Sequence, residues 1–213
     1  HQPFNWLAEF YHIIHDNGGF DVIIGNPPYV EFPSKDVQYS FERLQSSTCG
    51  NLYGCCFERG LSIGNNYGKL GYIVPVAITC SQRMSPVISL LKNNSSVLAF
   101  ATFDDRPGKL FEMIQHLRAT ILISSRGHSP VRVWSTKYNR WYSQNRSYLF
   151  PMVKYTNVSE LVKDYTVPKL SMPLEVKIAS SIGRNTCPIG TFAGGGVNNS
   201  VYFRAAGGAT FFL

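Results

Sequence analysis

The sequence predicts an α/β fold, because segments with helical spacing of apolar residues alternate along the chain with short apolar runs. Of the 213 residues, 44% are hydrophobic and 15% are charged, which allows a packed core and excludes a wholly disordered chain. No apolar run approaches the roughly 20 residues that cross a bilayer. The five cysteines form no paired C-x-x-C spacing, so neither a disulfide framework nor a metal site is predicted. We expect a soluble cytoplasmic protein with reduced thiols.

The first two predicted elements are a helix and a strand. Residues 4–15 place Phe4, Leu7, Tyr11 and Ile14 at helical spacing, and the Asp-Asn-Gly-Gly run that follows ends the helix. The sequence FDVIIG at residues 20–25 is β-branched and bounded by glycine, which predicts a buried strand. A helix that leads into a buried strand is the repeating unit of a parallel α/β sheet.

The later elements follow the same alternation. Helices are predicted at residues 51–63, 84–91 and 173–182, and strands at 69–75, 97–103, 117–124 and 131–135. A Gly-His-Ser-Pro turn at residues 127–130 predicts that the last two strands pair with each other. A domain boundary is expected near Tyr165, dividing residues 1–165 from a glycine-punctuated segment at 166–213.

Positive charge is concentrated in the second half of the chain. Residues 1–108 carry a net charge of −2 and residues 109–213 a net charge of +9. Between Arg126 and Tyr155 no acidic residue occurs, and aromatic residues separate the cations. Cations neutralise phosphates and rings provide stacking faces, so the tract predicts a nucleic-acid surface, although a solvated face is an equal alternative. The candidate phosphate contacts are Arg126, Arg132, Lys137, Arg140 and Arg146.

The sequence Asn26-Pro27-Pro28-Tyr29 follows the first predicted strand. In an open α/β sheet, ligands bind beyond the carboxyl ends of the strands. Proline lacks an N–H, so two prolines leave carbonyl acceptors free on a stiff turn, and the Asn26 side chain adds another acceptor. Two acceptors aimed at one point suit an exocyclic amino group, and Tyr29 offers a face on which an aromatic base can stack.

This motif also carries a family resemblance. GGFDVIIGNPPYVEF resembles the catalytic strand and loop of S-adenosylmethionine-dependent DNA N6-adenine methyltransferases of restriction-modification systems, in particular the single-chain Type IIG enzymes. NLYGCCFERGLSIGNNYGKLGYIVP is similar to the next helix and strand of that family, and KLFEMIQHLRATILI to a later strand. IGTFAGGGVNNSVYF is weakly similar to the entry into its target-recognition domain.

The resemblance implies a role for each matched residue. Asn26 and the Pro27 carbonyl would hold the adenine amino group, Tyr29 would stack on the base, and Phe111 would close its other face. Phe103 is the second choice for that face, and core packing is the alternative for either phenylalanine. The cofactor, S-adenosylmethionine, would lie against Gly25, Asn26 and Pro27, and double-stranded DNA would be the partner.

The implied fold is a partial Rossmann-like methyltransferase sheet, the C-terminal half of the catalytic domain, followed by the start of a target-recognition domain. Family members carry an F-x-G-x-G turn upstream of the motif, and nothing before Phe20 supplies one. We therefore expect a piece of a longer protein that lacks most of the cofactor site and is inactive by itself. FAGGG at residues 192–196 would supply that turn only in a permuted order.

Three alternatives to DNA methylation remain open from the sequence. The Asn-Pro-Pro-Tyr motif also serves methylation of glutamine amides in release factors and of guanine amino groups in ribosomal RNA. A non-catalytic DNA-binding module is the third. His12 and His15, one helical turn apart, are interpreted as surface residues, and Asp104 to Arg106 as a turn with a local ion pair.

Overall fold

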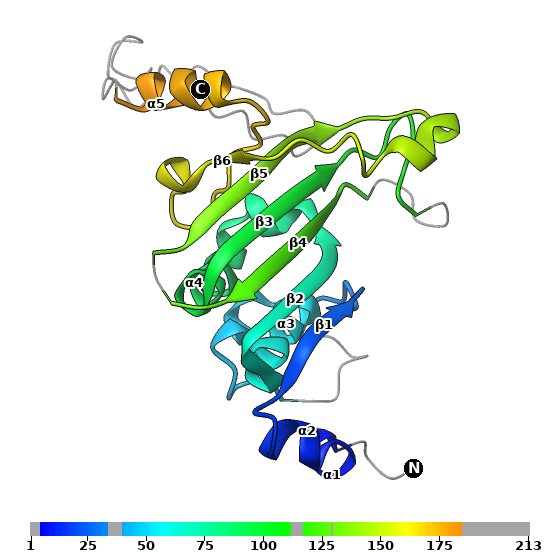
Figure 1. The fold of residues 1–213 in the computed structure, drawn as a ribbon, viewed down its shortest axis with the longest axis vertical. Coiled ribbons are helices and arrows are strands. Elements are labelled where there is room, and N and C mark those ends of the chain that lie inside the picture. Colours follow the sequence, from blue (N-terminus) through cyan, green and yellow to red (C-terminus); the bar gives the residue numbers. More distant parts are fainter. Residues whose placement is uncertain (1–4, 34–39, 112–116, 129, 185–213) are drawn as a thin grey trace.

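The computed structural model describes residues 5–33, 40–111, 117–128 and 130–184. Its centre is a six-stranded mixed sheet, which confirms the predicted α/β class (Figure 1). The strand order is β1-β2-β4-β3-β5-β6. The strands are β1 (Phe20–Gly25), β2 (Gly64–Pro75), β3 (Ser95–Phe103), β4 (Ala119–Arg126), β5 (Arg132–Asn139) and β6 (Thr156–Asn157).

The helices lie close to their predicted positions. The α-helices are α1 (Trp6–Glu9), α2 (Tyr11–His15), α3 (Leu52–Ile63), α4 (Ser85–Asn94) and α5 (Pro173–Arg184). Five 3-10 turns join them: η1 (Gln45–Cys49), η2 (Val76–Thr79), η3 (Gln82–Met84), η4 (Ser143–Tyr148) and η5 (Ser159–Leu161). The predicted first helix is divided because Phe10, at φ −123° and ψ 35°, leaves the helical region. In the described ranges, no helix is long and apolar enough to span a membrane.

The main core lies between the sheet and the pair α3 and α4, which cover one face of it (Figure 1). Tyr53 and Phe57 of α3 and Ile88 of α4 pack against strand residues such as Leu98 and Phe100. Asn51 ends the preceding turn, and its side chain accepts a hydrogen bond from the Tyr53 N–H at 3.4 Å, the usual role of an N-cap. The helix predicted at residues 51–63 is therefore confirmed, and the structure shows which of its residues form the core face.

β1 differs from its prediction as a buried strand. In the described part of the chain it pairs with β2 alone, so it forms the edge of the sheet. Val22 is 60% exposed and Ile24 79% exposed, because no described element covers their face. The β-branched run specifies an extended backbone, but neighbouring elements decide whether an extended segment is buried.

The predicted pairing of the fourth and fifth strands is wrong. β3 lies between β4 and β5, antiparallel to the first and parallel to the second. The turn from Gly127 therefore crosses two strand spacings, about 10 Å, which five residues easily span. Gly127 has a φ of +154°, and its N–H donates to the Asn94 carbonyl at 3.3 Å. β3 takes the central place because both of its faces carry apolar side chains: Leu98 and Phe100 on one, Ala101 and Phe103 on the other.

A second, smaller apolar cluster covers the other face of the sheet near the end of β3. It consists of Ala101, Phe103, Trp141 and Leu149, with Leu110 packed against it. Phe103 meets Trp141 edge to face at a centroid distance of 5.9 Å. Trp141, an aromatic residue of the tract between Arg126 and Tyr155, is thus a core residue. The sequence did not distinguish such core residues from residues of a stacking surface.

The chain remains packed on the main core beyond the predicted boundary near Tyr165. Val167 is buried there, and its N–H donates to the Thr79 carbonyl at 2.9 Å. After Leu170 the chain continues into α5, whose Val176 still packs against the main core, whereas its Leu174, Ile178 and Ile182 are exposed. The division into two regions stays a prediction, and most of the second region lies outside the described residues.

Candidate active site

One edge of the sheet collects the ends of several strands. β1 is parallel to β2, and Pro75 at the end of β2 pairs with Ala119 at the start of β4. Phe103 at the end of β3 pairs with the same Ala119 and with Asn139 at the end of β5. The segments that leave β1, β2, β3 and β5, and the segment that enters β4, therefore share this edge, which we call the carboxyl edge. It is the position at which open α/β sheets bind ligands.

The Asn-Pro-Pro-Tyr segment lies at the carboxyl edge, directly after β1. The Asn26 side chain is exposed, and the Tyr29 hydroxyl lies 2.5 Å from its Oδ1 and 2.9 Å from the Ile73 carbonyl oxygen. A hydroxyl has one proton, so Tyr29 divides its donation between these two acceptors. The Asn26 oxygen has two lone pairs and keeps one for a further donor. The structure thus brings together Asn26 and Tyr29, two of the predicted catalytic residues.

Tyr29 is partly buried and packs against the main core. Its ring meets Tyr53 edge to face at a centroid distance of 6.3 Å. Burial raises the pKa of Tyr29 to about 12, so its hydroxyl stays protonated and able to donate at neutral pH. β1 ends at Gly25, which pairs with Tyr72 of β2. The Tyr29 hydroxyl then donates to the carbonyl of Ile73, the next residue of β2, so it continues the hydrogen bonding beyond the end of β1.

The loop after Tyr29 is attached to the N-terminus of α3. The Leu52 N–H donates to the Val30 carbonyl at 2.9 Å, and the Phe32 N–H donates to the Gly50 carbonyl at 3.0 Å. Arg83 strengthens this junction, because its guanidinium contacts Glu31 at 2.8 Å and the Gly50 carbonyl at 3.2 Å. Sequence reasoning missed the pair of Arg83 and Glu31, which are 52 residues apart and give no local signal.

Gly50 is required at this junction. Its φ of +64° lies in the left-handed region, and a Cβ there would lie 2.8 Å from the Arg83 guanidinium. A larger residue would displace the side chain that supports the loop.

The two candidate phenylalanines differ in exposure. Phe103 is 1% exposed within the second apolar cluster, so it is a core residue and cannot reach a substrate. Phe111 is partly exposed on the segment between β3 and β4, which leaves and returns at the carboxyl edge. Phe111 therefore remains the candidate for stacking on the second face of the base, and its segment lies at the same carboxyl edge as Tyr29.

Asp104 forms an ion-pair centre at this edge. Its carboxylate is 4% exposed and accepts hydrogen bonds from Nε of Arg118 at 2.9 Å and Nε of Arg140 at 2.6 Å. Burial by itself would raise the pKa of Asp104, but these two guanidinium groups outweigh it and hold the pKa at about 2. These ion pairs are long-range, since their cations come from the segments beside β4 and β5, and they differ from the local pair that the sequence suggested within residues 104–106.

The five predicted phosphate contacts do not form one surface. Arg126 ends β4 and donates to Asn94 at 3.1 Å, and Arg132 begins β5, so both lie at the edge opposite Asn26. The seven residue steps of β5 separate Arg132 from the carboxyl edge by about 23 Å. Lys137 lies near that edge and is exposed, with no side-chain partner in the described ranges. Arg140 binds Asp104, and Arg146 binds backbone carbonyls.

The histidines behave as the sequence interpretation proposed. His12 and His15 are exposed, and each contacts Asp16 through Nδ1 at 2.8 Å. These contacts lower the pKa of Asp16, with His15 contributing most. Within the described ranges, no group of three His, Cys, Asp or Glu residues could hold a metal ion.

Comparison with known proteins connects this geometry to one enzyme family. A family model described as Eco57I restriction-modification methylase matches residues 1–108. The Type II restriction enzyme and methyltransferase RM.Eco57I of Escherichia coli is 22% identical over 152 residues, which cover 66% of this chain and 15% of that protein. The chain thus corresponds to a small part of this relative.

Two solved structures share the fold. A DrdV–DNA complex matches with a TM-score of 0.52 and 11% identity, covering 64% of this chain and 17% of that chain. The ATP-dependent Type ISP restriction-modification enzyme LlaBIII bound to DNA matches with a TM-score of 0.50 and 15% identity, covering 64% of this chain and 12% of that one. At these identities the likeness extends to the fold alone.

Proposed function

The chain belongs to the Eco57I restriction-modification methylase family, and from this premise we propose that the protein transfers a methyl group from S-adenosylmethionine to the N6 amino group of a flipped adenine in DNA. The observation that carries the proposal is the exposed Asn26 side chain at the carboxyl edge, whose oxygen is oriented by the Tyr29 hydroxyl. Its remaining lone pair suits a hydrogen of an exocyclic amino group.

The chemistry explains why acceptors are needed. When bound, S-adenosylmethionine supplies an electrophilic methyl group. Transfer of that methyl group would form the N–C bond with the adenine N6 lone pair, would leave the C–S bonding pair on sulfur, and would release one N6 proton to water. As N6 becomes positive its hydrogens become more acidic, so a hydrogen bond to Asn26 Oδ1 strengthens toward the transition state. The Pro27 carbonyl is the proposed second acceptor.

Aromatic side chains would hold the base. A methyltransferase cannot reach an amino group inside a duplex, and flipping the nucleotide costs a few kcal/mol. Stacking on the Tyr29 ring and against Phe111 would offset that cost, since each base stacked on an aromatic side chain gains about 1–3 kcal/mol. Both residues lie on segments that leave the carboxyl edge.

The described residues fit part of a cofactor site. Gly25 and Asn26 are exposed at the end of β1, and Gly25 has no side chain to obstruct a ligand. Pro27 is buried, and its proposed contribution is its backbone carbonyl. We propose that the glycine-rich turn comes from elsewhere in the protein that carries this chain, beside the free edge of β1. The target-recognition domain is proposed for the residues after 165.

The test is to express the protein that carries this chain in a host whose DNA lacks N6-methyladenine and to sequence that DNA by a long-read method that detects the modified base. We expect N6-methyladenine at one short sequence, and none from an Asn26→Ala variant that expresses equally. Unmodified DNA, or methyl transfer to protein glutamine or ribosomal RNA guanine, would overturn the proposal.

A further inference from the structure

We propose that Arg146, which the sequence suggested as a phosphate contact, is a positioning residue that holds the segment bearing Phe111. The proposal rests on the proposed function, because it concerns the closing of the pocket around the flipped base. It is carried by the two hydrogen bonds that the Arg146 guanidinium makes. Nη1 donates to the Lys109 carbonyl at 3.1 Å and Nη2 donates to the Leu110 carbonyl at 2.9 Å.

The arrangement is a two-pronged contact to consecutive peptide units. The planar guanidinium presents two parallel donors in a fixed geometry, so it fixes the direction of the backbone as well as its distance. The two carbonyls belong to the residues immediately before Phe111. A shift of the guanidinium therefore moves the Phe111 Cα directly.

Other contacts attach the same segment to the same support. The Gly108 N–H donates to the Trp141 carbonyl at 2.8 Å, and Leu110 packs against the apolar cluster that contains Trp141 and Leu149. At the start of the segment, the Asp104 N–H donates to the Asn139 carbonyl at 3.1 Å. Residues 104–110, which leave the end of β3, are thus bound by residues 139–149, which leave the end of the neighbouring β5 (Figure 1).

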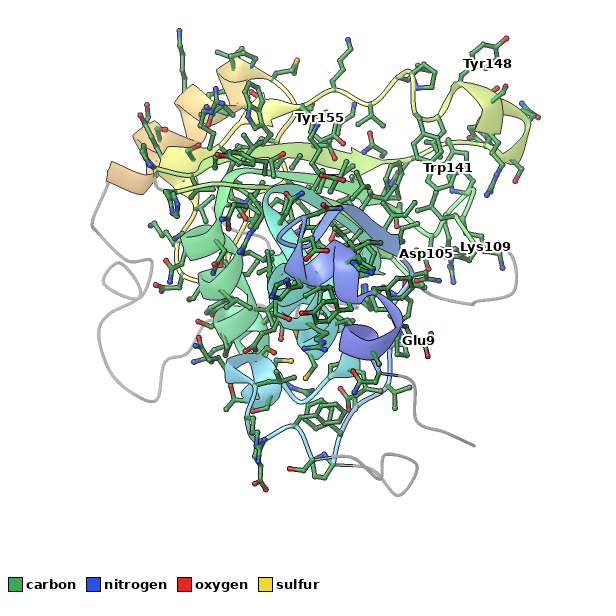
Figure 2. All side chains as sticks on the ribbon, turned by 60° about the horizontal axis from the view of Figure 1, so that its bottom comes forward. Glu9, Asp105, Lys109, Trp141, Tyr148 and Tyr155 are labelled. Atoms are coloured by element: carbon green, nitrogen blue, oxygen red, sulfur yellow. The ribbon has the colours of Figure 1, made fainter. Side chains whose placement is uncertain are left out.

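Gly108 shows how closely the two segments approach. A Cβ at this position would lie 2.7 Å from both Nε1 and the carbonyl oxygen of Trp141, so only glycine fits without a backbone shift. Figure 2 shows Lys109 and Asp105 on the same side of the molecule as Trp141, with Tyr148 further out. The donors of Arg146 are directed inward to this junction, which leaves fewer of them for a phosphate.

The experiment compares four variants of the protein that carries this chain: Arg146→Gln, Arg146→Lys, Gly108→Ala, and Lys92→Gln as a control that removes one charge at the opposite edge of the sheet. The readouts are methylation turnover, the slope of log DNA affinity against log salt, and amide hydrogen exchange of a peptide covering residues 104–111. For a misplaced stacking residue we expect turnover to fall about 10- to 100-fold in the first three variants. The salt slope should stay at the wild-type value in those three, and exchange should rise in the 104–111 peptide while other peptides keep their protection.

Two results would overturn the proposal. A phosphate contact predicts that Arg146→Gln lowers the slope by about 0.9 and that Arg146→Lys restores it, with unchanged exchange. Unchanged exchange in Arg146→Gln would by itself show that the segment does not depend on this residue. If the wild-type protein methylates no DNA, the proposed function fails, and the exchange data still decide whether Arg146 holds the segment.

Discussion

Replacing Tyr29 by Phe separates the two tasks that we propose for this side chain, base stacking by the ring and hydrogen bonding by the hydroxyl. The ring is retained, so stacking on a base is unchanged. The hydroxyl is lost, and with it the hydrogen bonds to Asn26 Oδ1 and to the Ile73 carbonyl. We therefore expect a defect in turnover without a comparable defect in DNA affinity.

The magnitude follows from burial and geometry. An acceptor that loses its donor costs about 1–3 kcal/mol when buried, and since Tyr29 is only partly buried we expect about 1 kcal/mol of stability to be lost. That loss lowers the melting temperature by roughly 2–4 °C for a domain of this size. Release of the Asn26 amide from its fixed direction should remove a similar amount from transition-state binding, and thus reduce turnover about fivefold.

The assay is single-turnover methylation of a DNA duplex that contains the target adenine, with DNA affinity measured in parallel. Tyr29→Ala serves as the matched variant, because it also removes the stacking face and should weaken DNA binding by about tenfold or more. A Tyr29→Phe protein with wild-type turnover and melting temperature would refute the role of the hydroxyl.

The pH dependence gives a second check on the same residue. The pKa of Tyr29 is raised to about 12, so the unfolded chain releases this proton near pH 10 while the folded protein still retains it. The hydroxyl therefore contributes stability that is complete below pH 10 and declines as pH rises toward 12. The stability difference between wild type and Tyr29→Phe should shrink across that window.

Three other substitutions test the site. Asn26→Ala should reduce turnover far more than DNA affinity, because its acceptor acts chiefly in the transition state, and near wild-type turnover would exclude the amino-holding role. Asp104→Asn should destabilise the protein at pH 7 by about 2 kcal/mol, because the pKa of Asp104 in the folded protein lies near 2, whereas its ordinary value is 3.8. That difference, measured by urea unfolding, is lost as pH falls through the folded pKa, and a difference that persists at pH 2 would contradict the ion-pair account. Lys137→Gln should lower the salt slope of binding by about 0.9 for cognate and unrelated DNA alike, and an unchanged slope would remove Lys137 from the DNA surface.

Local signals were reliable where the chain makes its own structure. Helical spacing of apolar residues in segment 51–63 predicted α3 itself, and the structure shows that Tyr53, Phe57 and Leu61 lie on its buried face. The strand FDVIIG and the position of Asn26 after it were also read correctly. The prediction that this strand is buried was wrong, because the elements that pack on a strand decide its burial, and its own sequence does not.

The candidate site divides in the same way. Sequence alone predicted the α/β class and the Asn-Pro-Pro-Tyr segment beyond the first strand, and it proposed Asn26 and Tyr29 as site residues, because these inferences depend on local spacing and on side-chain chemistry. Only the tertiary structure decided that β3 separates β4 from β5, that Arg126 and Arg132 lie far from Asn26, and that Arg146 binds the backbone before Phe111. Composition gives the number of charged residues but not their positions in space. Strand order and the folding of distant segments onto one edge determine which charged residue contacts which partner.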